Sequence, residues 1–93
     1  MVQIKNMVSA SGNSVANQFL ILENGVRYFK SYNSMIAKWN GTILVLGRDW
    51  DYSRTTLKYL KIFMEDFTSF KTEKANIQKQ IDDSTILYDC NML

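Results

Sequence analysis

The chain has no histidine among its 93 residues. This absence excludes Ser-His-Asp and Cys-His catalysis, histidine-ligated zinc sites and the side chain that most often acts as a general base near neutral pH. A single cysteine, Cys90, excludes an intrachain disulfide and therefore the disulfide framework of a small secreted domain. A reducing cytoplasm is the expected compartment.

Clustered glycines and long apolar runs are also lacking. The four glycines stand singly at positions 12, 25, 41 and 47, so the chain has no glycine-rich phosphate-binding loop. Its longest apolar runs, such as ILVL, are four residues long and far too short to cross a bilayer. The N-terminal stretch has no continuous apolar segment of a secretion signal. We therefore expect no membrane partner.

Charge and apolar content are both moderate. Eleven Lys and Arg against nine Asp and Glu give a net charge of +2, which is too small to indicate a generic polyanion binder. The apolar content of 46% is that of a globular chain. A chain of this length buries roughly 60–65% of the surface that its unfolded form exposes. We expect one domain, residues 1–93, with one modest core.

Two Asn-Gly pairs predict β-hairpins, because a two-residue type I′ turn needs positive φ at both central positions. The pair at 24–25 joins VANQFLIL to VRYFKSY and places Leu20 opposite Phe29 and Ile21 opposite Tyr28. The pair at 40–41 joins SMIAKW to TILVL. The pairs expected across this second turn are Trp39–Thr42, Ala37–Leu44 and Met35–Leu46.

Two further stretches complete the expected sheet. The turn SASGN should fold VQIKNM back onto VANQFLIL, because Gly and Asn accept positive φ. The stretch SYNS is either a tight turn or a bend within one long strand from Val26 to Trp39, and we favour the bend. The result is an antiparallel meander of four or five strands.

The apolar spacing becomes helical after Trp50. Residues at i, i+3, i+4 and i+7 form one apolar stripe: Leu60, Phe63, Met64 and Phe67. We expect a helix from Ser53, its N-cap, to about Thr68. A weaker helix should follow from Thr72 to Ile81, and STILYDC should form a short last strand. The predicted fold class is α+β: a curved antiparallel meander packed against one amphipathic helix, with a short C-terminal helix and strand.

Two chemical interpretations of the stretch DWDYS fail. Asp49, Asp51 and Ser53 could open a calcium loop, but an EF-hand needs Gly and Glu where this chain has Arg54 and Leu60. An aspartyl-phosphate phosphatase loop needs a large parallel sheet, which this short chain of hairpins cannot supply. We expect no metal site. The methionines at 35 and 64 lie at core positions, and no cofactor is expected.

The cations of the main helix are the clearest candidate for a binding face. Arg54, Lys58 and Lys61 lie at i, i+4 and i+7, opposite the apolar stripe. Four aromatic residues could provide stacking surfaces beside them: Tyr32, Trp39, Trp50 and Tyr52. Cations beside aromatics suit single-stranded nucleic acid. The simpler interpretation, which we favour, is a solvated helix face with the aromatics in the core.

The order of motifs resembles an uncharacterised family of short proteins encoded by phages, plasmids and integrated elements. The resemblance runs from Asn13 to Asn91, through NQFLI, YFKSYNSMIAKWNG, WDYSRTTLKYLKIF and ILYDCN. SYNS with the following IA, and WDYSRTTLKY with its following Phe, are the most specific parts. The resemblance implies a gene context and no known activity, so it assigns no catalytic residue.

The second motif has a structural explanation, a capped helix held on the sheet by aromatics. Its residues are Trp50, Tyr52, Ser53, Thr56, Tyr59 and Phe63. A partner-binding surface would leave the same pattern. We therefore expect a small non-enzymatic accessory protein that binds a host or phage protein, with inhibition of a host defence nuclease as one form. The alternative is a nucleic-acid-binding module; the oligomeric state is left open. Candidate partner-binding residues are Arg54, Lys58, Lys61, Tyr32 and Tyr52.

Overall fold

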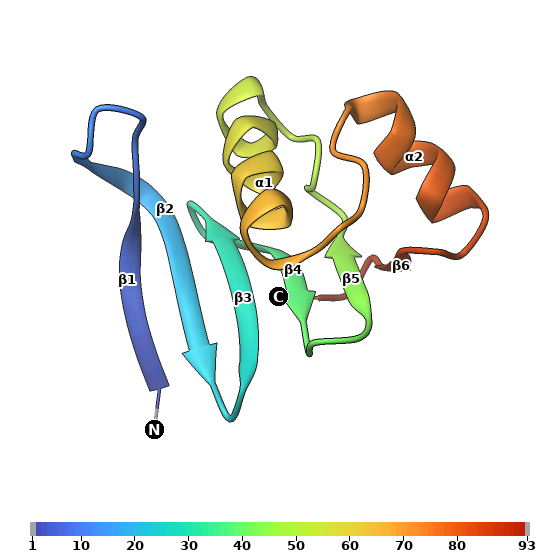
Figure 1. The fold of residues 1–93 in the computed structure, drawn as a ribbon, viewed down its shortest axis with the longest axis horizontal. Helices are drawn as coiled ribbons and strands as arrows, with labels where there is room; N and C mark the ends of the chain where they lie inside the picture. Colours follow the sequence, from blue (N-terminus) through green and yellow to red (C-terminus); the bar gives the residue numbers. More distant parts are fainter. Residues whose placement is uncertain (1, 93) are drawn as a thin grey trace.

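A computed structural model describes residues 2–92, which form one six-stranded sheet and two helices (Figure 1). The strands lie in chain order, and each pairs antiparallel with the next except β5 and β6, which are parallel. The fold is α+β, as predicted. The elements are β1 (Val2–Val8), β2 (Ser14–Glu23), β3 (Val26–Ser31), β4 (Ser34–Trp39), β5 (Leu44–Gly47), α1 (Arg54–Phe67), α2 (Lys74–Asp82) and β6 (Leu87–Asp89).

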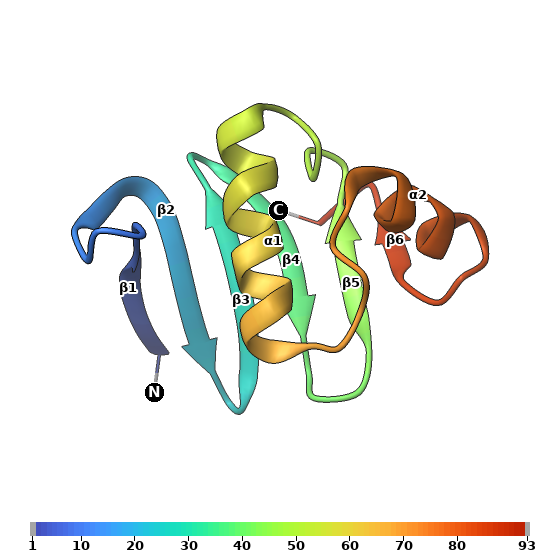
Figure 2. The same ribbon diagram turned by 45° about the horizontal axis from the view of Figure 1, so that its top comes forward.

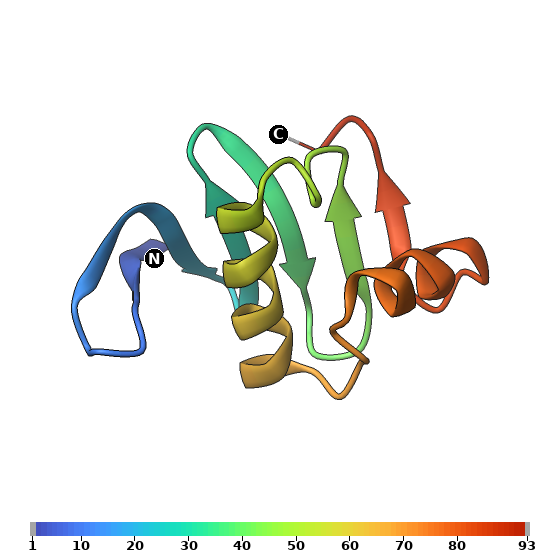
Figure 3. The same ribbon diagram turned by 90° about the horizontal axis from the view of Figure 1, so that it is seen from above.

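The main helix packs across the middle of the sheet. Figures 2 and 3 show α1 lying over β3 and β4, with α2 beside β5 and β6. The rings of Phe29 on β3 and Phe63 on α1 stack with centroids 6.1 Å apart, and both side chains are fully buried. Ile77 of α2 and Ile86 before β6 join the same apolar core. The apolar stripe predicted for α1 is therefore its buried face.

The hairpin between β2 and β3 forms as predicted. Asn24 and Gly25 have φ of 52° and 79°, the positive values that a type I′ turn requires. Leu20 pairs with Phe29 and Ile21 with Tyr28. The turn between β1 and β2 also confirms its prediction, because β1 folds back antiparallel onto β2.

The register predicted for the second Asn-Gly hairpin is wrong by two residues. Trp39 pairs with Leu44 and Ala37 with Leu46. The loop has four residues because the Asn40 side chain organises it: Oδ1 accepts hydrogen bonds from the backbone N–H of Thr42 (2.9 Å) and Ile43 (2.8 Å). Gly41 has a positive φ, 98°, and Asn40 does not, so the type I′ turn does not form.

The shift by two residues keeps every side chain on its expected face, because side chains alternate with a period of two. Ala37, Leu44 and Leu46 are fully buried, as the core-face prediction required. The error therefore changes the strand pairing and leaves the core composition intact.

The favoured interpretation of SYNS as a bend is wrong, because SYNS is a tight turn. β3 ends at Ser31, β4 begins at Ser34, and these two residues pair. Tyr32 takes a φ of 55°, and its N–H donates a 2.7 Å hydrogen bond to the carbonyl of Asn17, itself at φ 64°. Bulky residues rarely adopt positive φ, so local sequence rules do not predict this turn. The meander therefore has five strands.

The helices begin and end close to their predicted positions. Ser53 caps α1, since its Oγ accepts a 3.1 Å hydrogen bond from the backbone N–H of Thr56. Thr68 is the C-cap. The second helix, predicted over 72–81, spans 74–82 in the structure, and the predicted last strand is β6.

Candidate binding cleft

The two most specific sequence motifs meet at one cleft. The turn between β3 and β4 forms one wall, and the loop that enters α1 forms the other, so residues some twenty positions apart become neighbours. The cleft holds about 530 Å³, within the range of about 300–1,000 Å³ typical of ligand pockets. Its lining residues are Ser31, Tyr32, Asn33, Ser34, Ile36, Asp49, Tyr52, Ser53, Thr55 and Thr56.

A chain of hydroxyl groups links the two walls. Thr56 Oγ1 and Ser31 Oγ share a hydrogen bond of 2.9 Å, and both residues are buried. Ser53 Oγ donates to Thr56 Oγ1 at 3.1 Å while it accepts from the Thr56 N–H. Because Thr56 Oγ1 accepts the hydrogen bond from Ser53, the Thr56 hydroxyl can donate its own proton to Ser31 Oγ. The N-cap of α1 is thus also part of the cleft.

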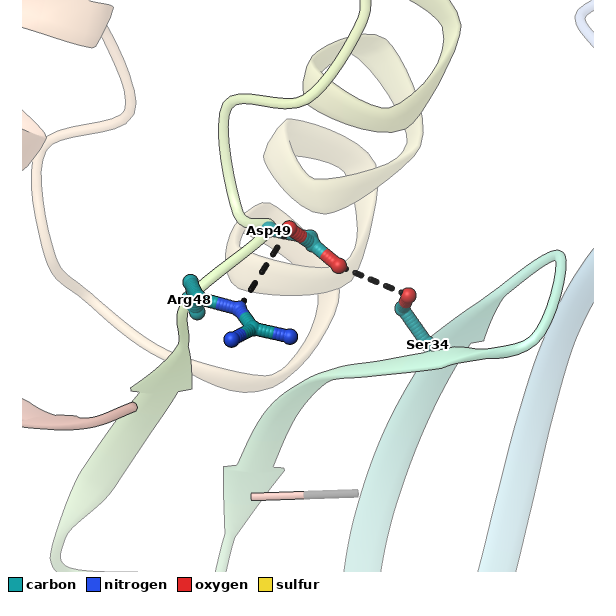
Figure 4. Close-up of polar contacts among 3 residues, drawn as sticks. All are labelled: Ser34, Arg48 and Asp49. Carbon is teal, nitrogen blue, oxygen red and sulfur yellow. Dashed lines mark hydrogen bonds and ion pairs between the residues drawn. The ribbon is translucent and has the colours of Figure 1, made fainter. Parts of the chain in front are cut away.

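Asp49 is the one charged side chain among the ten residues that line the cleft. Ser34 Oγ donates a 2.8 Å hydrogen bond to its Oδ2, as Figure 4 shows. Arg48 Nε lies 4.0 Å from Asp49 Oδ1, with side chains 70% and 34% exposed. Exposed pairs at such distances contribute little stability. The carboxylate is therefore held in place by Ser34 and has only a weak partner in Arg48.

Two predicted partner-binding residues, Tyr32 and Tyr52, lie at this cleft. Tyr32 is 46% exposed on the turn, and Tyr52 is 73% exposed on the loop before α1. One belongs to each motif, and both residues line the cleft. Tyrosine offers a large, rigid contact surface together with a polar hydroxyl, which is why interfaces are enriched in it.

The three predicted basic residues form a separate face. Arg54 and Lys58 are exposed and Lys61 is partly buried, but none of them lines the cleft. Lys58 Nζ lies 5.5 Å from the centroid of the Tyr59 ring. The five candidate partner-binding residues thus form two groups: Tyr32 and Tyr52 lie at the cleft, and the three basic residues lie on a separate face of α1.

The structural interpretation of the second motif agrees with the observed burial except at Tyr52, which is exposed and does not hold the helix on the sheet. Trp50 and Tyr59 are 4% and 5% exposed, and Phe63 is fully buried. Trp50 therefore offers no stacking surface to nucleic acid. Trp39 is partly buried and packs edge-on against Phe70, with centroids 6.1 Å apart. Of the four aromatics considered for stacking, Tyr32 and Tyr52 are the ones that border the cleft.

Sequence reasoning considered Asp49 only for calcium and phosphate chemistry, and it missed Gln18. The place of Asp49 in the cleft became visible only in the folded chain. Gln18 pairs across β2 and β3 with Ser31, a cleft residue, and is fully buried. Its Oε1 and Nε2 make no hydrogen bond to any described residue. Nothing in the local sequence distinguishes this glutamine from an exposed one.

Comparison with protein families gives a match over most of the chain. Residues 2–82 match a family of unknown function, DUF8033. The chain belongs to this family. All ten cleft residues and both helices lie inside the matched region, whereas β6 lies outside it. The expected membership of an uncharacterised family is confirmed at this level.

Two other comparisons found no match, neither among curated proteins nor among solved structures. Within residues 2–92, no helix of this DUF8033 member is long and apolar enough to span a membrane.

Proposed function

We propose that this DUF8033 protein acts by binding another protein through the cleft and its tyrosine rim, and that it is not an enzyme. The observation that carries the proposal is the convergence of the two most specific motifs on one cleft bordered by exposed tyrosines. A hydroxyl-rich cleft with exposed aromatics suits recognition, because tyrosines add contact area at a low cost in conformational entropy.

The resemblance to short phage- and plasmid-encoded proteins supports a specific context for this binding. In that context the protein is an accessory factor of a mobile element that acts in the host cytoplasm. Its partner is a host or phage protein, and we propose inhibition of a host defence nuclease, such as a CRISPR effector, as its role.

A second candidate function is single-stranded nucleic-acid binding by α1. The observation in its favour is that Arg54, Lys58 and Lys61 form no ion pair with any described residue, so their charges are available. Binding through such a face would weaken steeply with added salt, because each neutralised phosphate releases counterions. We expect no appreciable binding to short single-stranded DNA or RNA near physiological salt.

The experiment that tests the protein-binding proposal is affinity capture from host cells with two matched double variants. One variant, Tyr32→Asn with Tyr52→Ser, changes the cleft rim; asparagine tolerates the positive φ at position 32. The other, Arg54→Glu with Lys58→Glu, changes the basic face. We expect the rim variant to lose the captured protein and the basic-face variant to retain it.

Two outcomes would contradict the proposal. If the folded rim variant captures the same protein as the wild type, the cleft is not the binding surface. If wild-type protein binds single-stranded DNA or RNA in a salt-sensitive way and the basic-face variant does not, the second candidate replaces the first. Circular dichroism of each variant checks that the fold persists.

A further inference from the structure

The chemistry of the cleft identifies the kind of group it accepts. We infer that the cleft binds the guanidinium group of an arginine side chain that the partner protein presents. This inference rests on the proposed function and specifies which feature of the partner the cleft recognises. It follows from three properties of the lining: one fixed carboxylate, two exposed tyrosines, and hydrogen-bond acceptors on the exposed residues Asn33 and Thr55.

The carboxylate supplies the charge. Asp49 carries the only formal charge among the residues that line the cleft, and Ser34 fixes its Oδ2. Its Oδ1 is 4.0 Å from Arg48 Nε, beyond the usual range of a charge-assisted hydrogen bond. Arg48 does not line the cleft, so Asp49 is the charge that an incoming cation would meet there.

The two tyrosines supply aromatic surface at the entrance. Tyr32 and Tyr52 both border the cleft and are 46% and 73% exposed. A guanidinium group is planar and weakly hydrated, so it stacks on aromatic rings more readily than an ammonium group does. An arginine that enters between the motifs can therefore contact a ring and the Asp49 carboxylate together.

The remaining lining favours a group with many donors. The Thr55 hydroxyl and the Asn33 side chain are on exposed residues and provide acceptors at the cleft, whereas the hydroxyls of Ser31, Ser53 and Thr56 are paired with one another. Guanidinium has five N–H donors in a fixed arrangement and no acceptor. A lysine ammonium has three donors from a single point and would use fewer of these acceptors.

An anion is the main alternative occupant, because α1 begins at the cleft and a helix N-terminus favours negative charge. Two features oppose it. Ser53 Oγ already occupies the Thr56 N–H, one of the free donors of the first turn. The Asp49 carboxylate would also repel an anion within the same cleft. The cation is therefore the occupant that fits the lining.

The inference can be tested without the partner, by NMR titration of the ¹⁵N-labelled protein with acetyl-Gly-Arg-Gly-amide. Matched peptides carry lysine or the uncharged isostere citrulline, and inorganic phosphate serves as the anion probe. We expect the arginine peptide to shift the amide signals of Asn33, Asp49 and Thr55. The lysine peptide should bind more weakly, and citrulline and phosphate should leave these signals in place.

Two variants test whether the Asp49 carboxylate is the charge that binds the arginine peptide. Asp49→Asn keeps an acceptor for Ser34 and should lower the affinity for the arginine peptide about tenfold. Asp51→Asn removes an equal charge two residues away, at a position that does not line the cleft, and should change the affinity less than about twofold. The paired comparison separates contact in the cleft from a change in net charge.

Four results would overturn the inference. The first two are no shift of the cleft amides at the highest soluble concentration of the arginine peptide, and equally strong binding of the lysine or citrulline peptide. Shifts caused by phosphate, or equal effects of the two variants, would also overturn it. The titration and the capture experiment can give opposite results, so failure of the arginine site and failure of the protein-binding proposal are distinguishable. A rim variant that loses the partner while the arginine peptide causes no shift would refute the arginine site and leave the protein-binding surface intact.

Discussion

At the scale of single residues, the two motifs combine packing and recognition in adjacent positions. Trp50 is 4% exposed, whereas Tyr52, two residues later, is 73% exposed. Ser53 then caps α1 and also lines the cleft. Neighbouring residues of one motif therefore have different roles, and substitutions should separate stability from binding.

We expect Trp50→Ala to lower the free energy of unfolding by about 3–5 kcal/mol, because it removes a buried aromatic side chain from the core. Tyr52→Ala is the matched control and should change stability by less than about 0.5 kcal/mol, since its ring is exposed. Chemical denaturation of both variants measures the difference. Equal stability of Trp50→Ala and the wild type would contradict the structural role of this residue.

Ser53→Ala should cost about 1 kcal/mol of stability through loss of the helix cap. Partner binding should persist, since the tyrosine rim and Asp49 are unchanged. Thermal unfolding and the capture assay check the two statements. A variant that is as stable as the wild type but has lost binding would show that this hydroxyl serves recognition and not capping.

Gln18→Met should raise stability by about 1 kcal/mol, because a buried amide without hydrogen bonds costs roughly 1–3 kcal/mol and methionine fills a similar volume. Gln3→Met, on the exposed part of β1, is the control and should be neutral. Denaturant titrations compare the two. A destabilised Gln18→Met protein would mean that the amide makes hydrogen bonds in solution.

At the scale of secondary-structure elements, local chemistry predicted most boundaries and failed at two turns. The Ser53 cap, the apolar stripe of α1 and the type I′ turn at Asn24 depend on neighbouring residues, and all three were predicted. The register after Asn40 depends on a side-chain hydrogen bond to its own loop, and the turn at Tyr32 depends on Asn17 in another strand. Sequence spacing alone does not contain these contacts.

The close packing of β5 against β4 requires glycine at position 47, which was not predicted from the sequence. A Cβ at this position would lie 2.5 Å from the Met35 carbonyl oxygen, on the neighbouring strand. We expect Gly47→Ala to destabilise the protein by about 3 kcal/mol through overpacking against rigid backbone. Gly25→Asn is the control: a Cβ at this position would meet no atom within 4 Å, and asparagine tolerates positive φ better than most residues. Similar unfolding midpoints for both variants would contradict the close packing of β4 and β5.

At the scale of the whole molecule, the cleft exists only in the folded chain. Ser34 meets Asp49 across 15 residues of sequence, and Ser31 meets Thr56 across 25. The sequence therefore identified both motifs and several of their residues, but it could not show that the motifs form one surface. It also grouped the basic residues of α1 with the tyrosines, which the fold separates. The order of β1, β2 and β3 and the buried face of α1, by contrast, followed from the hairpin turns and the apolar stripe.

The measurement that tests the central claim most directly is site-specific photo-crosslinking in host cells. The photoreactive amino acid p-benzoylphenylalanine replaces Tyr52 at the cleft or, as a matched control, Tyr88, which is 48% exposed on β6 and does not line the cleft. We predict one discrete crosslinked protein from position 52 and none from position 88. Crosslinks to nucleic acid from position 52, or the same protein crosslinked equally from both positions, would contradict a protein-binding cleft.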